Sequence, residues 1–253
     1  MAEAIFRFYE ELNDFLPRYR RKTDFVLTSA DKRSIKDAIE SLGVPHTEID
    51  LILVNGKSVD FNYILQDKDR VSVYPVFESL NITDVTRLRK LPLRKSKFIA
   101  DINLGKIAKY MRVLGFDLYF DPMLSPREIV EISNKENRII LTTSRKLLKF
   151  KNVSHGIFVR PGSTMQQIKR IIDYLDIEDM VVPFTRCLQC NSLLDTVPKE
   201  EILERIPPKV RAFCDAYVRC EFCDKIYWKG THYIQMQTIV EQILGPSYIP
   251  FEP

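Results

Sequence analysis

Two pairs of cysteines constrain the fold of this chain more than any other feature. Cys187 and Cys190 form one C-x-x-C pair, and Cys220 and Cys223 form a second. Each pair can lie on a tight turn that directs two thiolates toward one tetrahedral ion, as in zinc ribbons. The pairs predict a structural Zn²⁺ held by four sulfurs, which leaves no open position for catalysis. Thiol redox chemistry is the alternative for such motifs.

The fifth cysteine, Cys214, is expected to be a buried or free thiol and is not counted as a ligand. No apolar stretch approaches the ~18 residues that cross a bilayer, which argues against a membrane partner. The N-terminus has acids where a secretory signal has bases. We therefore expect a cytoplasmic protein, in which a disulfide framework would not persist.

Residues 1–78 are predicted to form a β-grasp, ubiquitin-like domain. The expected elements are strands over 4–9 and 24–28, a helix over 35–42, and strands over 51–59 and 70–77. Ser34 is suited to cap the helix, and Asn55-Gly56 to form a hairpin turn. The second half resembles small sulfur-carrier proteins, but the chain continues without their Gly-Gly terminus, which excludes carrier chemistry. The domain is expected to dock a protein partner or position RNA.

A basic linker is predicted over 79–96. Between Thr86 and Gly115, nine Lys or Arg residues surround one acid, Asp101. Such a run is typical of a surface that binds a polyanion. The alternative is a solvated linker and helix face.

Residues 97–184 alternate strand and helix, which predicts an α/β domain with a parallel sheet between helices. The expected strands cover 97–101, 116–120, 138–143 and 156–161, and the expected helices cover 103–115, 125–137, 144–150 and 164–176. Ser125 and Thr164 are the predicted caps of the second and last helices.

Acids follow two of these strands, where α/β sheets place their working sites. Asp101 ends the first strand, Asp121 follows the second, and Glu128 lies on the next helix. Three converging carboxylates repel one another unless they bind a cation, and oxygen ligands suit Mg²⁺ or Mn²⁺. Such ions promote phosphodiester hydrolysis. The alternative for each acid is a helix cap or a surface charge.

Residues 185–253 are predicted to be a zinc ribbon with a C-terminal tail. After the second cysteine pair, aromatic and basic residues interleave, including Trp228, Lys229 and His232. This composition suits stacking and phosphate contacts on single-stranded RNA. Packing of Trp228 and Tyr227 in a small ribbon core is the alternative, and both uses are compatible.

Several segments together resemble the Mut-seven C-terminal RNase family. They are FIADINLGKIAKYMRVLGFDLYF, IILTTSRKLL, RCLQCNSLL and YVRCEFCDKIYWKGTHY, and the first segment, with FRFYEELNDFLP, is similar to the ubiquitin-like domain that accompanies the family. The resemblance covers nearly the whole chain. It implies a PIN-like nuclease fold with a zinc ribbon and metal-dependent cleavage of RNA.

The resemblance implies that Asp101 is the principal ligand of a catalytic Mg²⁺ or Mn²⁺, assisted by Asp121 and Glu128. The family pattern L-T-x-D-R departs here, because the chain reads Leu-Thr-Thr-Ser-Arg and places Ser144 at the aspartate position. A hydroxyl can orient a water but supplies no charge, so we expect weaker metal binding.

The sequence thus predicts a cytoplasmic, RNA-binding endoribonuclease. The expected RNA contacts are Lys106, Arg112, Arg145, Lys146, Arg186, Trp228, Lys229 and His232. One alternative is a catalytically weakened or inactive RNA-binding or ribosome-associated adaptor, which accounts for Ser144 directly. Another is a protein-interaction module whose basic run is only solvated.

Overall fold

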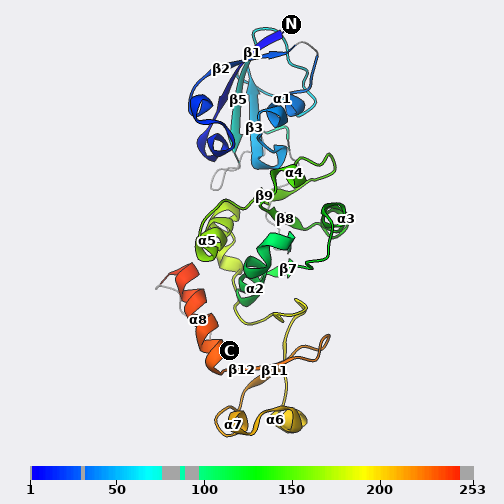
Figure 1. Ribbon diagram of the computed structural model, residues 1–253, viewed down its shortest axis with the longest axis vertical. Coiled ribbons are helices and arrows are strands. Elements are labelled where there is room, and N and C mark those ends of the chain that lie inside the picture. The colour runs from blue at the N-terminus through cyan, green and yellow to red at the C-terminus, as the bar shows by residue number, and fades with distance from the viewer. Residues whose placement is uncertain (1, 30–31, 76–85, 89–96, 246–253) are drawn as a thin grey trace.

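The computed structural model describes residues 2–29, 32–75, 86–88 and 97–245. Three units follow one another along its longest axis, with the N-terminal unit at one end and the cysteine-bearing unit at the other (Figure 1). Most of the predicted basic linker lies outside the described residues. Within it, the Thr86 hydroxyl donates to the Asp50 carbonyl and Leu88 packs on the N-terminal core.

The N-terminal unit is the predicted β-grasp domain. Its strands are β1 (Ala2–Phe8), β2 (Phe25–Ser29), β3 (Ile49–Val54), β4 (Lys57–Ser58) and β5 (Arg70–Pro75). They form one sheet in the order β2-β1-β5-β3-β4, in which β1 and β5 pair in parallel. Helix α1 (Ile35–Ser41) is capped by Ser34, as predicted, and buries Ile35 and Ile39 against the sheet.

Short 3-10 helices fill the connections of this domain. They are η1 (Glu10–Phe15), η2 (Arg18–Arg20) and η3 (His46–Glu48). Both η1 and η3 face the central unit, because residues of each contact it directly.

The central unit is an α/β domain with a wholly parallel sheet. Its strands are β6 (Lys97–Ala100), β7 (Asp117–Tyr119), β8 (Ile139–Thr142) and β9 (Gly156–Phe158), in the order β7-β6-β8-β9. Its helices are η4 (Ile102–Leu104), α2 (Gly105–Val113), α3 (Pro126–Glu136), α4 (Arg145–Leu148), α5 (Thr164–Leu175) and η5 (Glu178–Met180).

Successive residues of the middle strands enter different cores because strand side chains alternate between faces. Phe98 packs with the cluster that includes α2 and α5, whereas Ile99 packs with the cluster that includes α3 and α4. Ile140 and Leu141 divide in the same way. Burial on both faces explains why these strands are apolar runs.

One predicted helix cap is wrong. Ser163, not Thr164, caps α5: its hydroxyl accepts from the Gln166 amide, and the Gln166 side chain accepts from the Ser163 amide. This reciprocal arrangement satisfies two amides at once, and Thr164 becomes the first helical residue.

The C-terminal unit contains a small antiparallel sheet and a long final helix. The sheet order is β10 (Asp195–Thr196), β11 (Tyr217–Arg219) and β12 (Ile226–Trp228). Short turns of helix, α6 (Lys199–Ile202), η6 (Leu203–Arg205) and α7 (Pro208–Arg211), fill the interval between the cysteine pairs, as expected. Helix α8 (Thr231–Leu244) returns to the central unit, where Val240 and Ile243 join its core.

Buried polar contacts fix the ubiquitin-like domain on the α/β domain. Glu48 is 1% exposed, and its carboxylate accepts from the Phe158 amide at 2.6 Å and lies 3.4 Å from an Arg160 nitrogen. His46 lies 2.6 Å from a Glu40 carboxylate oxygen and 3.0 Å from the Val153 carbonyl. A buried carboxylate needs such partners, so this interface has one specific geometry.

Within the described ranges, no helix is long and apolar enough to cross a membrane.

Candidate functional site

The carboxyl ends of the two middle strands meet at a buried carboxylate. Asp101 follows β6, is 5% exposed and caps η4 by accepting from the Asn103 amide at 2.9 Å. Its other oxygen accepts from the Thr142 hydroxyl and, at 3.1 Å, from the Thr143 amide. These donors belong to β8 and the turn after it. The sheet thus fixes the orientation of Asp101 at the strand ends, as the sequence predicts for its working site.

Ser144 belongs to the same polar group. Its amide donates to the Thr142 hydroxyl oxygen at 2.9 Å, and its own hydroxyl caps α4 by accepting from the Leu147 amide at 3.4 Å. Ser144 is therefore joined to Asp101 through Thr142. The side chain also has a local role, since it satisfies a free amide of α4.

The other two predicted acids are held in local turns. Asp121 accepts from the Met123 amide at 2.9 Å. Glu128 is exposed and accepts from the Ser125 amide at 2.7 Å in a capping box, and these hydrogen bonds lower the pKa of its carboxyl below the ordinary value. Within the described part of the chain, these two acids and Asp101 form no group of close ligand atoms. As placed, the three acids do not fit one divalent cation, and the Mg²⁺ or Mn²⁺ site stays a prediction.

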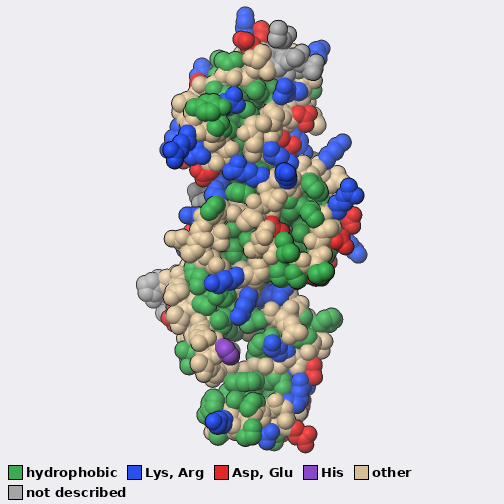
Figure 2. All heavy atoms as spheres, viewed as in Figure 1, with side chains coloured by type: hydrophobic (Ala, Val, Ile, Leu, Met, Phe, Trp, Pro, Cys, Tyr) green, Lys and Arg blue, Asp and Glu red, His purple; other side chains and the backbone are tan. Residues whose placement is uncertain are grey.

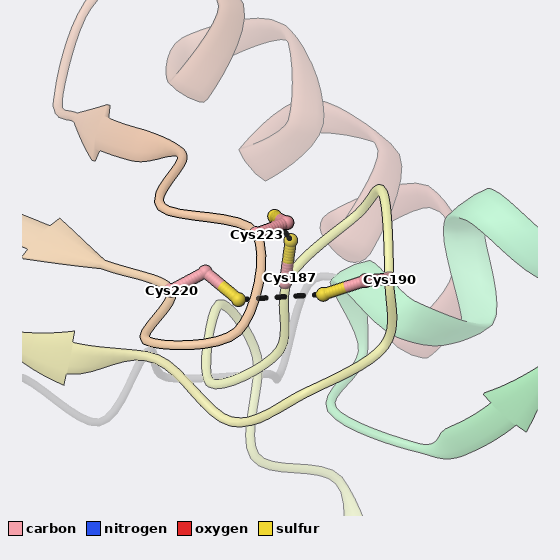
Figure 3. Close-up of side chains that lie close together, drawn as sticks. All are labelled: Cys187, Cys190, Cys220 and Cys223. Atoms are coloured by element: carbon pink, nitrogen blue, oxygen red, sulfur yellow. Dashed lines mark hydrogen bonds between the residues drawn. The ribbon is translucent and has the colours of Figure 1, made fainter.

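The four paired cysteines do come together. All four sulfur atoms lie within 4.8 Å of one another, and they point from two loops toward one place (Figure 3). The sulfur of Cys187 lies 3.4 Å from that of Cys223, and the sulfur of Cys190 lies 3.3 Å from that of Cys220. Zinc–sulfur bonds of about 2.3 Å place tetrahedral ligands about 3.8 Å apart, so the cluster fits Zn²⁺. Cys214 is buried in a separate cluster with Tyr217.

The two cysteine loops have the same backbone construction. The Asn191 amide donates to the Cys187 carbonyl at 3.0 Å, and the Asp224 amide donates to the Cys220 carbonyl at 2.8 Å. Both Asn191 and Asp224 have positive φ, at 72° and 59°, a conformation that Asn and Asp tolerate well. Each C-x-x-C sequence therefore closes into a tight turn that presents two sulfurs on one side.

Local hydrogen bonds favour a thiolate at Cys190. Burial raises the pKa of this thiol, but the Ser192 side chain and amide, with Cys220 and Cys187, outweigh that effect and lower the pKa to about 6. The thiolate is the form that binds metal.

Side chains of the central domain hold the first cysteine loop. Arg112 on α2 is 5% exposed; it donates to the Leu118 carbonyl at 2.9 Å and to the carbonyls of Leu188 and Gln189 at 3.0 and 3.1 Å. Burial lowers the pKa of its guanidinium, although Cys187, Cys190 and Asp117 oppose that shift. Arginine remains charged despite such shifts, so a cation lies beside the cysteine cluster.

Asn191 makes a second connection between the two units. Its side-chain oxygen accepts from the Leu118 amide at 3.0 Å, and its side-chain nitrogen donates to Asp117 at 2.7 Å. Burial raises the pKa of Asp117, but hydrogen bonds from Arg138 and Asn191 outweigh this and hold it below the ordinary value. Sequence reasoning missed Asp117, Asn191 and Arg138. The local signal for this group is Asp117 itself, an acid at the start of the apolar strand β7.

Two family models match the chain, one over the N-terminal domain and one over the α/β domain and the cysteine-bearing unit. The Mut7-C RNAse domain model matches residues 96–240, more than half of the sequence, and the Mut7-C ubiquitin model matches residues 1–81. The chain belongs to the Mut7-C RNAse domain family. No curated protein and no solved structure matches it in the other two comparisons. The family supports a ribonuclease-type function for this α/β domain.

The three arginines predicted to contact RNA all bond to protein carbonyls in this Mut7-C chain. Arg112 is buried in the contacts described above, and the structure does not support a phosphate contact there. Arg186 donates to the Gly115 and Asn191 carbonyls. Arg145 donates to the Phe15 carbonyl at 3.3 Å.

The other predicted RNA contacts lie at or near the surface. Lys106 on α2, Lys146 on α4, Lys229 and His232 are exposed. Trp228 is partly buried against the ribbon cluster that contains Tyr217, so the packing alternative for its side chain is confirmed. The exposed lysines of α2 and α4 follow the strand-end site in sequence and remain candidates for phosphate contacts.

Replacing one zinc ligand tests the metal centre. Cys220→Ser is expected to lower bound zinc to less than about a tenth of one equivalent and expose the ribbon to protease, because ribbon folding and metal binding are coupled. Cys214→Ala is the matched control, since this buried thiol lies outside the cluster. Zinc analysis after dialysis makes the measurement. A full equivalent of zinc in Cys220→Ser would contradict the ligand set.

Proposed function

We propose that this Mut7-C protein is a ribonuclease whose reaction takes place at the strand ends around Asp101. The observation that carries the proposal is the buried Asp101 carboxylate, fixed by the Thr142 hydroxyl and the Thr143 amide at the carboxyl end of a parallel sheet. The family match over 96–240 supports the reaction class, and RNA is the substrate that it implies.

The chain supplies the remaining parts of such a site. The exposed Lys106 and Lys146 are the second residues of helices α2 and α4, which begin a few residues after Asp101 and Thr142. Cations placed there would bind the phosphates beside the scissile bond and offset the charge that develops on them. The proposed reaction is endonucleolytic, with cleavage at linkages within the RNA chain.

The structural Zn²⁺ and the catalytic Mg²⁺ or Mn²⁺ are proposed on different grounds. The four cysteines would hold a structural Zn²⁺, which would fix the ribbon against the α/β domain. Mg²⁺ or Mn²⁺ at Asp101, Asp121 and Glu128 rests on the family resemblance alone, because the three acids are not gathered here. Metal-binding thiols need a reducing compartment, which supports a cytoplasmic location.

An RNA-binding adaptor without nuclease activity is the second candidate. The separation of the three acids and the presence of Ser144 favour it. The adaptor would use the same exposed lysines and the same ribbon. Cleavage assays distinguish the two candidates, because only the ribonuclease loses an activity when Asp101 is replaced.

Asp101→Asn is expected to reduce RNA cleavage by about 100-fold or more, because it removes the only buried carboxylate charge of the site. Product formation should be measured in Mn²⁺ and again in EDTA, with RNA binding as a separate measurement. Asp179→Asn, which neutralises an exposed acid on η5, is the control and should cleave normally. Equal cleavage by Asp101→Asn and wild type would contradict the site, provided that both are folded.

Ser144→Asp and Ser144→Asn form a matched pair that isolates the effect of negative charge at position 144, where the family pattern has aspartate. Both residues are good N-caps, so α4 should be preserved in each. If this position contributes to cation binding, the aspartate variant should need about tenfold less Mn²⁺ for half-maximal cleavage, and the asparagine variant should not change. The same Mn²⁺ dependence in both variants would place residue 144 outside any metal site.

A further inference from the structure

A cationic loop of the ubiquitin-like domain presents one exposed aromatic ring. The segment Pro17-Arg-Tyr-Arg-Arg-Lys22, here called the basic loop, contains η2 and has no acid. Tyr19 is 76% exposed, and Arg18, Arg21 and Lys22 are also exposed. The Arg20 guanidinium lies 5.5 Å from the Tyr19 ring centre and 4.9 Å from that of Phe25. The Arg20 guanidinium thus lies close to both the exposed ring and a ring of the domain.

The basic loop is held in place by a buried side chain. Asn13 is 4% exposed; its nitrogen donates to the Phe8 and Glu10 carbonyls at 3.0 and 2.9 Å, and its oxygen accepts from the Lys22 amide at 2.7 Å. Arg21 further donates to the Leu16 carbonyl at 2.9 Å. Asn13 therefore ties the C-terminal end of the basic loop to the start of η1. A preorganised loop loses little conformational entropy when it binds a ligand.

Nearby aspartates do not neutralise the basic loop. Asp24 is paired with Arg7 at 3.0 Å and with Arg70 at 2.8 Å, both outside the loop. Asp14 lies 3.4 Å from Arg160 of the α/β domain. The cations of the loop thus keep their charge available to an external ligand.

Arg145 joins the strand-end site to η1, the element that precedes the basic loop. It donates to the Phe15 and Asp14 carbonyls at 3.3 and 3.4 Å, and its guanidinium lies 4.9 Å from the Phe15 ring centre. Arg145 follows Ser144, which is joined to Asp101 through Thr142. Lys and Arg side chains gather where the ubiquitin-like domain meets the α/β domain (Figure 2).

We propose that the basic loop binds single-stranded RNA, with Tyr19 stacking on a base and Arg18 and Lys22 contacting phosphates. Cations around an accessible ring are the combination that single-stranded nucleic acids require, because every base has a face to stack and every linkage a charge. The inference deepens the proposed ribonuclease function and rests on it for the position of the scissile phosphate. The ubiquitin-like domain then forms one side of the RNA path.

The stacking contact is tested by Tyr19→Ala and Tyr19→Phe. Affinity for a labelled single-stranded RNA of about 16 nucleotides should be measured by fluorescence anisotropy in the full-length Asp101→Asn protein, with the RNA checked for integrity. Tyr19→Ala should weaken binding by between about fivefold and about 100-fold, whereas Tyr19→Phe keeps the ring and should bind like the parent. Binding by Tyr19→Ala within twofold of the parent would overturn the proposal and leave the exposed ring to a protein partner.

The phosphate contacts are tested by charge removal. The double variant Arg18→Gln/Lys22→Gln should reduce the slope of log affinity against log salt by about 1.4, since each contact to a single strand contributes about 0.7. Lys57→Gln/Lys68→Gln is the matched control: both lysines are exposed, and Lys68, like Lys22, has positive φ. They lie near Val54 and Arg70, at the end of the sheet away from η1. Equal slopes in the two double variants would overturn these contacts.

The outcomes separate this proposal from the ribonuclease assignment. RNA binding that depends on Tyr19 without any cleavage by the wild-type protein would contradict the ribonuclease and leave the RNA-binding loop intact. Conversely, cleavage of an RNA of about 16 nucleotides at an unchanged KM in Tyr19→Ala would contradict the loop and leave the ribonuclease intact.

Discussion

The buried guanidinium of Arg112 is the interaction on which the arrangement of the two C-terminal units depends. It donates on one side to Leu118 of the edge strand β7 and on the other to the carbonyls of Leu188 and Gln189, inside the first cysteine pair. A buried cation without such acceptors would be strongly destabilising. The cysteine loop therefore supplies hydrogen-bond acceptors for a cation that the α/β domain buries. The Asn191 side chain also accepts a hydrogen bond from the Leu118 amide of the same edge strand.

The features that sequence predicted are those set by local patterns. Alternating strands and helices gave the parallel sheet and the position of Asp101 at a strand end, because apolar runs and caps such as Ser34 act within a few residues. The C-x-x-C spacing likewise indicated the cluster, since two residues between cysteines suffice to form each turn. The motif resemblance to the Mut7-C family rests on the same segments and is confirmed by the family match.

The features that sequence reasoning missed depend on distant partners. Positive charge suggested an RNA contact at Arg112, but its side chain is buried and carbonyls of the first cysteine loop accept its hydrogen bonds, which no local pattern reports. The tail after the ribbon is helix α8, whose Val240 packs with α5 residues that precede it by about 70 positions. Convergence of Asp121 with Asp101 was expected from topology alone, which does not determine how loops orient side chains.

Amide hydrogen exchange at Leu118, before and after zinc is removed by a chelator, tests most directly whether the cysteine loop is part of the α/β fold. Loss of the metal is expected to release Asn191, so that the Leu118 amide exchanges at least about tenfold faster. The Val73 amide in the ubiquitin-like sheet should keep its rate. An unchanged rate at Leu118 after complete loss of zinc would contradict the coupling between the metal centre and the α/β domain.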